Sequence, residues 1–150
     1  MWLLSRLADQ IYRLFGTKRL TALEDLCIHA WRDSLPERER GILDVQLQSA
    51  AFVQRGAAGA KLCLYYGSNT QAPMFCNKAP EAHVATVLFR SADPTNPKRM
   101  PARIYLVNGR FFSVEFPKRP WRYALLNRMI EPLQVAEVIT EQPVGDSTER

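Results

Sequence analysis

An Asn-Gly pair, Asn108-Gly109, separates two strand-like runs in the stretch RIYLVNGRFFSVEF. Both central residues of a type I′ turn need a positive φ, and asparagine and glycine tolerate that conformation best. The pair therefore predicts a tight antiparallel hairpin over residues 103–116. Counting outward from the turn gives the expected register, which pairs Leu106 with Phe111, Tyr105 with Phe112, Ile104 with Ser113 and Arg103 with Val114.

Both faces of this hairpin carry large apolar side chains, and the stretch HVATVLFRS at 83–91 has the same character. In that stretch, Val84 and Leu88 are expected on one face, and Val87 and Phe89 on the other. Strands of this kind are covered on both sides, so we expect them at the centre of a sheet. Residues 61–66 and 133–140 also have strand patterns.

Residues 42–55 admit two interpretations. A helix could open at Pro36, whereas residues 44–49 alternate polar and apolar side chains. On a helical wheel the apolar residues scatter instead of forming one stripe, so we favour a strand. Residues 56–59, which include two glycines, would then turn the chain into the next strand.

Two helices are predicted before the sheet. Apolar residues recur at helical spacing over residues 3–15. Thr21 and Glu24 have the spacing of a capping box and precede an apolar stripe that ends at Trp31. Residues 121–130 are expected to form a short helix between the hairpin and the last strand.

These elements predict an α+β fold, with two N-terminal helices packed on a mostly antiparallel sheet of about five or six strands and a short helix near the C-terminus. A chain of 150 residues fits one domain. Within it, residues 1–34 are the helical part, residues 42–140 the sheet-rich part and residues 141–150 a loose tail.

Charge is distributed unevenly along the chain. Residues 51–128 contain 12 basic and 3 acidic side chains, whereas residues 129–150 contain 1 basic and 5 acidic. A basic surface attracts anionic partners. No run reaches the roughly 18 apolar residues of a membrane span, and three cysteines at unrelated spacings make a poor disulfide framework. We therefore expect a soluble, cytoplasmic protein.

Few residues suggest catalysis. The chain has only two histidines, and a nucleophilic pair of Cys63 or Cys76 with His83 would need the fold to bring them together. Metal-ligand spacings are absent, so we expect no metal and no cofactor. Glu115, on the hairpin, is the carboxylate to inspect for a raised pKa, although a solvent-facing or arginine-paired role is the simpler interpretation.

Two basic segments flank the hairpin and should meet at the end away from the turn. Arginine and lysine hold phosphate, and a tryptophan there can stack on a base, although the same tryptophan could anchor the core. The candidate anion-binding residues are Lys98, Arg99, Arg103, Lys118, Arg119, Trp121 and Arg122.

The preferred function is a small intracellular, non-enzymatic interaction module, because no catalytic constellation is recognisable. The two N-terminal helices can cover one face of the central strands, and the other face needs either residues 121–130 or a partner, which would be another protein or a second copy of the chain. The alternative is a binder of nucleic acid or another polyanion through the basic residues beside the hairpin. A third alternative is an enzyme with a noncontiguous site.

Overall fold

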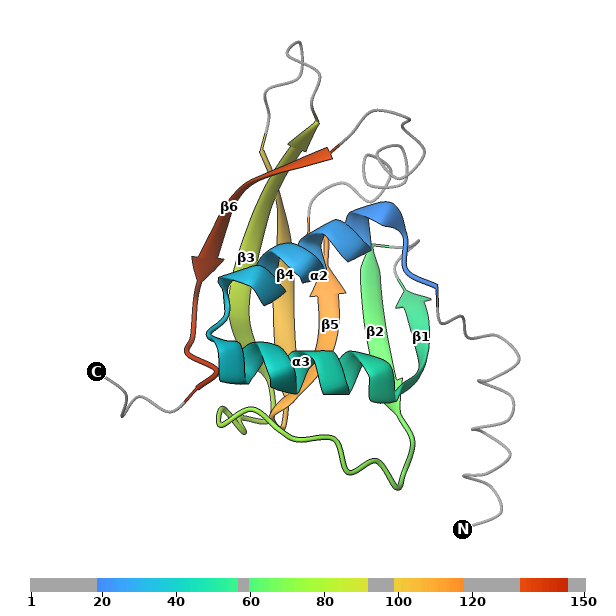
Figure 1. The fold of residues 1–150 in the computed structure, drawn as a ribbon. Helices are drawn as coiled ribbons and strands as arrows, with labels where there is room; N and C mark the ends of the chain where they lie inside the picture. The colour runs from blue at the N-terminus through green and yellow to red at the C-terminus, as the bar shows by residue number, and fades with distance from the viewer. Residues whose placement is uncertain (1–18, 57–59, 92–98, 118–132, 146–150) are drawn as a thin grey trace.

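The computed structural model describes residues 19–56, 60–91, 99–117 and 133–145. Two helices precede all the strands of this part of the chain (Figure 1). The predicted helices at 3–15 and 121–130 lie outside the described residues. The elements are α2 (Ala22–Ser34), α3 (Glu37–Ser49), β1 (Ala50–Gly56), β2 (Lys61–Tyr66), β3 (Ala82–Ser91), β4 (Met100–Val107), β5 (Arg110–Glu115) and β6 (Leu133–Thr140).

The six strands form one sheet in the order β1-β2-β5-β4-β3-β6, and every neighbouring pair is antiparallel. The predicted hairpin, β4 and β5, thus lies at the centre of the sheet, between β2 and β3. Both described helices cross the same face (Figure 1). The α+β class and the antiparallel sheet are confirmed.

Helix α2 begins as its sequence predicts. The Thr21 hydroxyl accepts a hydrogen bond from the Glu24 backbone N–H at 3.3 Å, and the Glu24 carboxylate accepts one from the Thr21 N–H at 2.8 Å. Trp31 lies on the buried stripe of the helix and packs between the Phe75 and Phe111 rings, at centroid distances of 5.9 and 5.5 Å. This contact joins α2 to the centre of the sheet.

The prediction of a strand over residues 42–55 is wrong for its first half, because α3 extends to Ser49 and only β1 is extended. The buried positions of α3 are Glu39, Leu43 and Gln46, which have helical spacing. Two of these three side chains are polar, so the buried stripe of the helix is invisible to a pattern of apolar residues. Strands β1 and β2 pair antiparallel, and residues 57–59 of the predicted turn between them lie outside the described residues.

The hairpin turn is confirmed, with φ of 50° at Asn108 and 78° at Gly109. Leu106 faces Phe111 as predicted, but the register then shifts by one residue. Phe112 is the extra residue of a β-bulge, so the remaining predicted pairs are wrong. The observed pairs are Tyr105 with Ser113, Ile104 with Val114 and Arg103 with Glu115.

A second irregularity between His83 and Ala85 corrects the prediction for β3. Val84 is buried in the core together with Val87 and Phe89, whereas Leu88 is only partly buried. Val84 was expected to share a face with Leu88. The bulge breaks the alternation on which that expectation depended.

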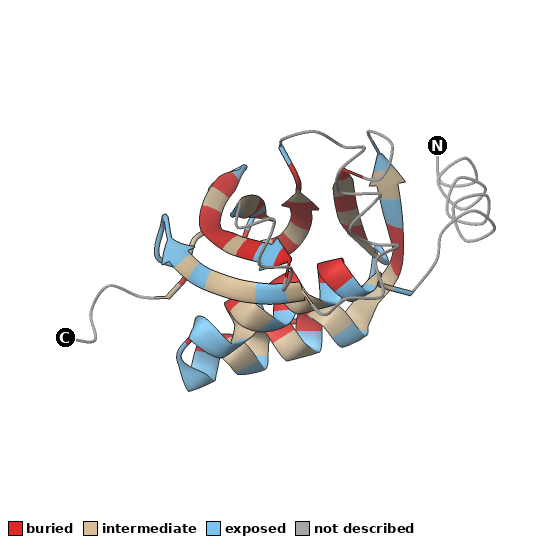
Figure 2. Cartoon of the chain, turned by 90° about the horizontal axis from the view of Figure 1, so that it is seen from above, coloured by how far each residue is buried: buried red, intermediate tan, exposed pale blue. Residues whose placement is uncertain are grey.

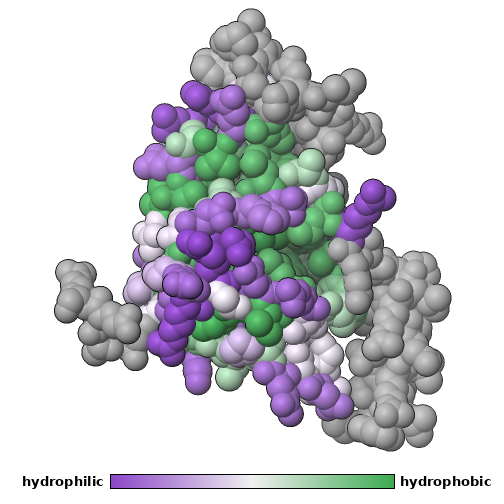
Figure 3. All heavy atoms as spheres, in the orientation of Figure 1, coloured by the Kyte–Doolittle hydropathy of each residue, from purple (hydrophilic) through white to green (hydrophobic). Residues whose placement is uncertain are grey.

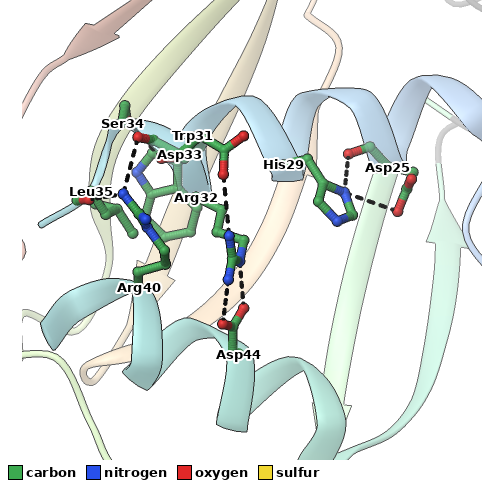
Figure 4. A network of polar contacts seen from close by, with 9 residues as sticks. All are labelled: Asp25, His29, Trp31, Arg32, Asp33, Ser34, Leu35, Arg40 and Asp44. Carbon is green, nitrogen blue, oxygen red and sulfur yellow. Dashed lines mark hydrogen bonds and ion pairs between the residues drawn. The ribbon is translucent and has the colours of Figure 1, made fainter. Parts of the chain in front are cut away.

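The core lies between the helices and the sheet, and the helix surfaces turned away from it carry exposed residues (Figure 2). Polar side chains gather over the helices on this side of the molecule, with apolar side chains visible around them (Figure 3). An ion pair links the two helices, because the Arg32 guanidinium donates to both Asp44 carboxylate oxygens at 2.6 Å (Figure 4). No described helix is long and apolar enough to cross a membrane.

Candidate functional site

The sheet face opposite α2 and α3, which we call the outer face, gathers most of the chemistry-bearing side chains of the described strands. Side chains alternate along a strand, so those next to the core residues Leu62 and Ile104 point away from the helices. The register then defines the outer face as Lys61, Cys63, Tyr65, His83, Thr86, Arg103, Tyr105, Phe112, Ser113 and Glu115.

Aromatic rings make up one part of the outer face. Tyr65 stacks on Phe52 at 5.0 Å and meets the Phe112 ring edge-on at 6.3 Å. Tyr105 stacks on the His83 ring at 5.1 Å. Phe112 and Tyr105 are each only partly buried, so aromatic surface remains accessible on this face.

Charged residues form a row beside these rings. Lys61 lies opposite Glu115 across β2 and β5, and Glu115 lies opposite Arg103 across β5 and β4. The Lys61 ammonium forms an ion pair of 2.5 Å with Glu115 and lies 5.9 Å from the centre of the Phe112 ring. The hydrogen bond to Glu115 raises the pKa of Lys61. Glu115 is therefore a paired carboxylate, as the simpler interpretation expected, although its partner is a lysine.

A depression of about 440 Å³ adjoins the aromatic rings near the hairpin turn and is lined by Tyr65, Phe112 and Arg110. The Arg110 guanidinium lies 5.6 Å from the centre of the Tyr66 ring. Together with Lys61 and Arg103, Arg110 adds positive charge to the described part of this side of the sheet.

His83 belongs to a polar chain that does not have the order of a catalytic triad. Its Nε2 lies 3.0 Å from the Thr86 hydroxyl, which donates to the Glu141 carboxylate at 2.7 Å. In a triad the histidine stands between the hydroxyl and the carboxylate. Here the hydroxyl stands between them, so the histidine cannot act as the base that the carboxylate orients.

The cysteines are not placed as nucleophiles in the described part of the chain. Cys63 and His83 are separated by β5 and β4, which at the usual strand spacing is roughly 14 Å. Burial raises the pKa of Cys63, and far more strongly that of Cys27, so neither is enriched in the reactive thiolate. Cys76 is exposed, and His83 has no cysteine among its described contacts. The described residues also contain no cluster of acidic, histidine or cysteine side chains that could hold a metal ion.

Most of the predicted anion site lies outside the described residues, namely Lys98, Lys118, Arg119, Trp121 and Arg122. Of the other two, Arg103 is exposed on the outer face, and Arg99 lies 3.5 Å from the Glu137 carboxylate of β6. The sequence did not identify Lys61 and Arg110 as basic residues on the same side of the sheet as Arg103, because no sequence signal shows that β2 lies beside β5.

Comparison of the chain with protein-family models, with curated proteins and with solved structures found no match. Function must therefore be argued from the site itself.

Proposed function

We propose that this protein is a non-enzymatic interaction module that docks a partner protein, or a second copy of itself, on the outer face. The observation that carries the proposal is the partly exposed pair Phe112 and Tyr105 on a sheet face opposite both described helices. Aromatic side chains are enriched among the residues that dominate protein interfaces. Such an interface would bury at least roughly 1,000 Å² in total.

The surroundings of the rings support the same proposal. Charged groups such as Lys61, Glu115 and Arg103 suit the polar rim of an interface, where they fix orientation and exclude wrong partners. The histidine and cysteine geometry argues against nucleophilic catalysis at this face, since His83 is engaged by Thr86 and the pKa of Cys63 is raised.

The test is the Phe112→Ala variant, compared with wild type by sedimentation at micromolar concentration and by capture of partners. The matched control is Val45→Ala, because Val45 is 41% exposed but lies on α3, on the other side of the sheet. We expect self-association or partner capture to be lost with Phe112→Ala and kept with Val45→Ala. A monomeric wild type whose captured proteins are identical for both variants contradicts the proposal.

A second candidate is polyanion binding, for which the favouring observation is the exposed Arg103 on the same side of the sheet as Lys61 and Arg110. Aromatic rings on a basic sheet face suit stacking with the bases of a single strand. Affinity for single-stranded RNA would then fall steeply as salt increases, and Arg103→Ala would reduce the log-log slope by about one. The control is Arg38→Ala, which removes an exposed arginine of α3. Binding that does not respond to salt would contradict this candidate.

A further inference from the structure

A separate pocket of about 290 Å³ lies on the helix side of the sheet, where α2 ends and α3 begins. Trp31, Leu35, Val84 and Val144 give it apolar walls, and Glu39 is the one ionisable side chain among its described lining residues. Its size is close to the lower limit of about 300 Å³ for small-molecule sites, which are likewise mostly apolar with a few polar groups.

Glu39 is only 8% exposed. Among the described residues its carboxylate has no hydrogen-bond or ion-pair partner. Because its oxygens are not among the enclosed, unpaired side-chain atoms of the described residues, the carboxylate faces the open pocket, where a bound cation would replace the water in contact with it. The carboxylate lies against Gly145, where an added Cβ would come within 2.6 Å of Oε1.

A second buried glutamate in the same helical position shows what Glu39 lacks. Glu24 and Glu39 are each the third residue of their helix. Glu24 accepts from the Thr21 N–H and from the Arg55 guanidinium. Glu39 has Pro36 at the corresponding cap position, and proline has no N–H to donate. The capping role is therefore closed to Glu39, and no arginine within the described ranges donates to its carboxylate as Arg55 does to Glu24.

We propose that this pocket binds a small organic cation, an ammonium or amidinium group on an apolar body, with Glu39 as the counter-ion. The positive end of the α3 dipole favours the ionised carboxylate at this position. An N–H-bearing cation would supply the missing hydrogen bonds and charge, and its apolar body would fill the space between Trp31, Val84 and Val144. The site is on the opposite side of the sheet from the outer face and does not depend on the function proposed for that face.

The first experiment uses the wild-type chain and two probes of the same shape, benzylammonium and benzyl alcohol, titrated by NMR. We expect benzylammonium to give saturable shifts at Trp31, Val84 and Val144. Its affinity should exceed that of benzyl alcohol by roughly tenfold or more, as a charge-assisted hydrogen bond does. Equal affinities, no saturable binding of benzylammonium, or shifts confined to other residues would overturn the proposal.

The second experiment compares Glu39→Gln with Glu37→Gln, which changes an exposed carboxylate in the same first turn of α3. Glu39→Gln should lower the affinity for benzylammonium by roughly tenfold or more while its melting temperature stays the same or rises, because an unpaired charge is removed. Glu37→Gln should bind as wild type does. Unchanged affinity of Glu39→Gln would overturn the proposal.

If Glu39→Gln does not fold, Gly145→Ala replaces it. The added methyl group would crowd the end of the Glu39 side chain and move the carboxylate without deleting it. Weaker benzylammonium binding by this variant supports the proposal, and binding equal to wild type contradicts it.

Discussion

Single polar residues determine how the two layers of this fold meet. Gln46 is fully buried on α3. Its amide oxygen accepts from the Phe111 N–H at 2.8 Å, and its amide nitrogen donates to the carbonyls of Pro73 and Gly109 at 2.7 and 3.1 Å. One side chain thus satisfies backbone groups of β5, of the hairpin turn and of the loop between β2 and β3.

The Gln46→Leu variant should therefore be strongly destabilised. It keeps a side chain of similar size but leaves the Phe111 N–H and the Pro73 carbonyl without their bond to Gln46. We expect a loss of about 2–4 kcal/mol in the free energy of unfolding, measured in urea. Gln48→Leu, at an exposed position of the same helix, should change stability by less than about 0.5 kcal/mol. Similar effects of the two changes would contradict the role given to Gln46.

Two arginine–carboxylate pairs should differ in importance because they differ in burial. The Glu24 side chain paired with Arg55 is 0% exposed, so Arg55→Gln leaves a charge inside the protein and should cost about 3 kcal/mol. Asp44, paired with Arg32, is 36% exposed, so solvent screens this pair and Arg32→Gln should cost clearly less than Arg55→Gln. Urea unfolding of both variants checks this order, and equal losses would contradict it.

The Arg32–Asp44 pair should also depend on pH. Its hydrogen bonds lower the pKa of Asp44 from the ordinary 3.8. A lowered folded-state pKa gives stability that is present above 3.8 and is lost as the pH falls through the folded value. Asp44→Asn should therefore be less stable than wild type at neutral pH, and the gap should close in acid. If the difference in stability persists at a pH where Asp44 is protonated in both the folded and the unfolded protein, the Arg32–Asp44 pair is not its cause.

At the scale of elements, the hairpin shows what a local signal can and cannot specify. Asn108 and Gly109 fix the turn and the first pair beyond it, since both have the positive φ that the turn needs. Next to the bulge at Phe112, the Phe111 N–H donates to Gln46 of α3, which lies 65 residues away along the chain and which no local pattern identifies as its partner. Local pairing rules therefore fail after the first pair.

The hairpin turn gives a prediction with an internal control. At Gly109 an added Cβ would lie 2.8 Å from the Phe75 carbonyl oxygen, and φ is 78°. Gly109→Ala should therefore lower the free energy of unfolding by about 2 kcal/mol. At Gly41, on α3, an added Cβ meets nothing within 4 Å, so Gly41→Ala should raise it by about 0.5–1 kcal/mol. Thermal unfolding of both variants tests the opposite signs, and a neutral Gly109→Ala would contradict the close approach.

The contrast between local signals and contacts between distant residues explains how much of the fold the sequence could predict. The strand patterns of β2, β3 and β6 and the capping box of α2 are local and were identified correctly. Helix α3 was missed because its buried stripe contains two polar residues, Glu39 and Gln46. Gln46 bonds to backbone groups far away along the chain, and Glu39 lines a pocket. The outer face was only partly anticipated, because the adjacency of Lys61 and Glu115 is a property of strand order.

For the whole molecule, the three cysteines sample three depths of the fold. Cys27 is fully buried on α2 between the layers, Cys63 is partly buried on the outer face, and Cys76 is exposed in the loop between β2 and β3. Their reactivities toward a thiol reagent therefore report separately on the core, the outer face and the surface.

We expect Cys76 to be labelled first, Cys63 more slowly and Cys27 only when the core opens. With a stability of at least about 5 kcal/mol, the opening equilibrium should slow Cys27 labelling by a factor of roughly a thousand or more. Burial also raises the pKa of Cys27 and Cys63, which lowers their thiolate fraction and supports the same order. Single-cysteine variants with mass-spectrometric detection measure each rate. Rapid labelling of Cys27 in the native protein would contradict a core closed between α2 and the sheet.

A macromolecule bound to the outer face should further slow the labelling of Cys63 and leave the labelling of Cys76 unchanged. Equal protection of both cysteines would place the bound macromolecule elsewhere.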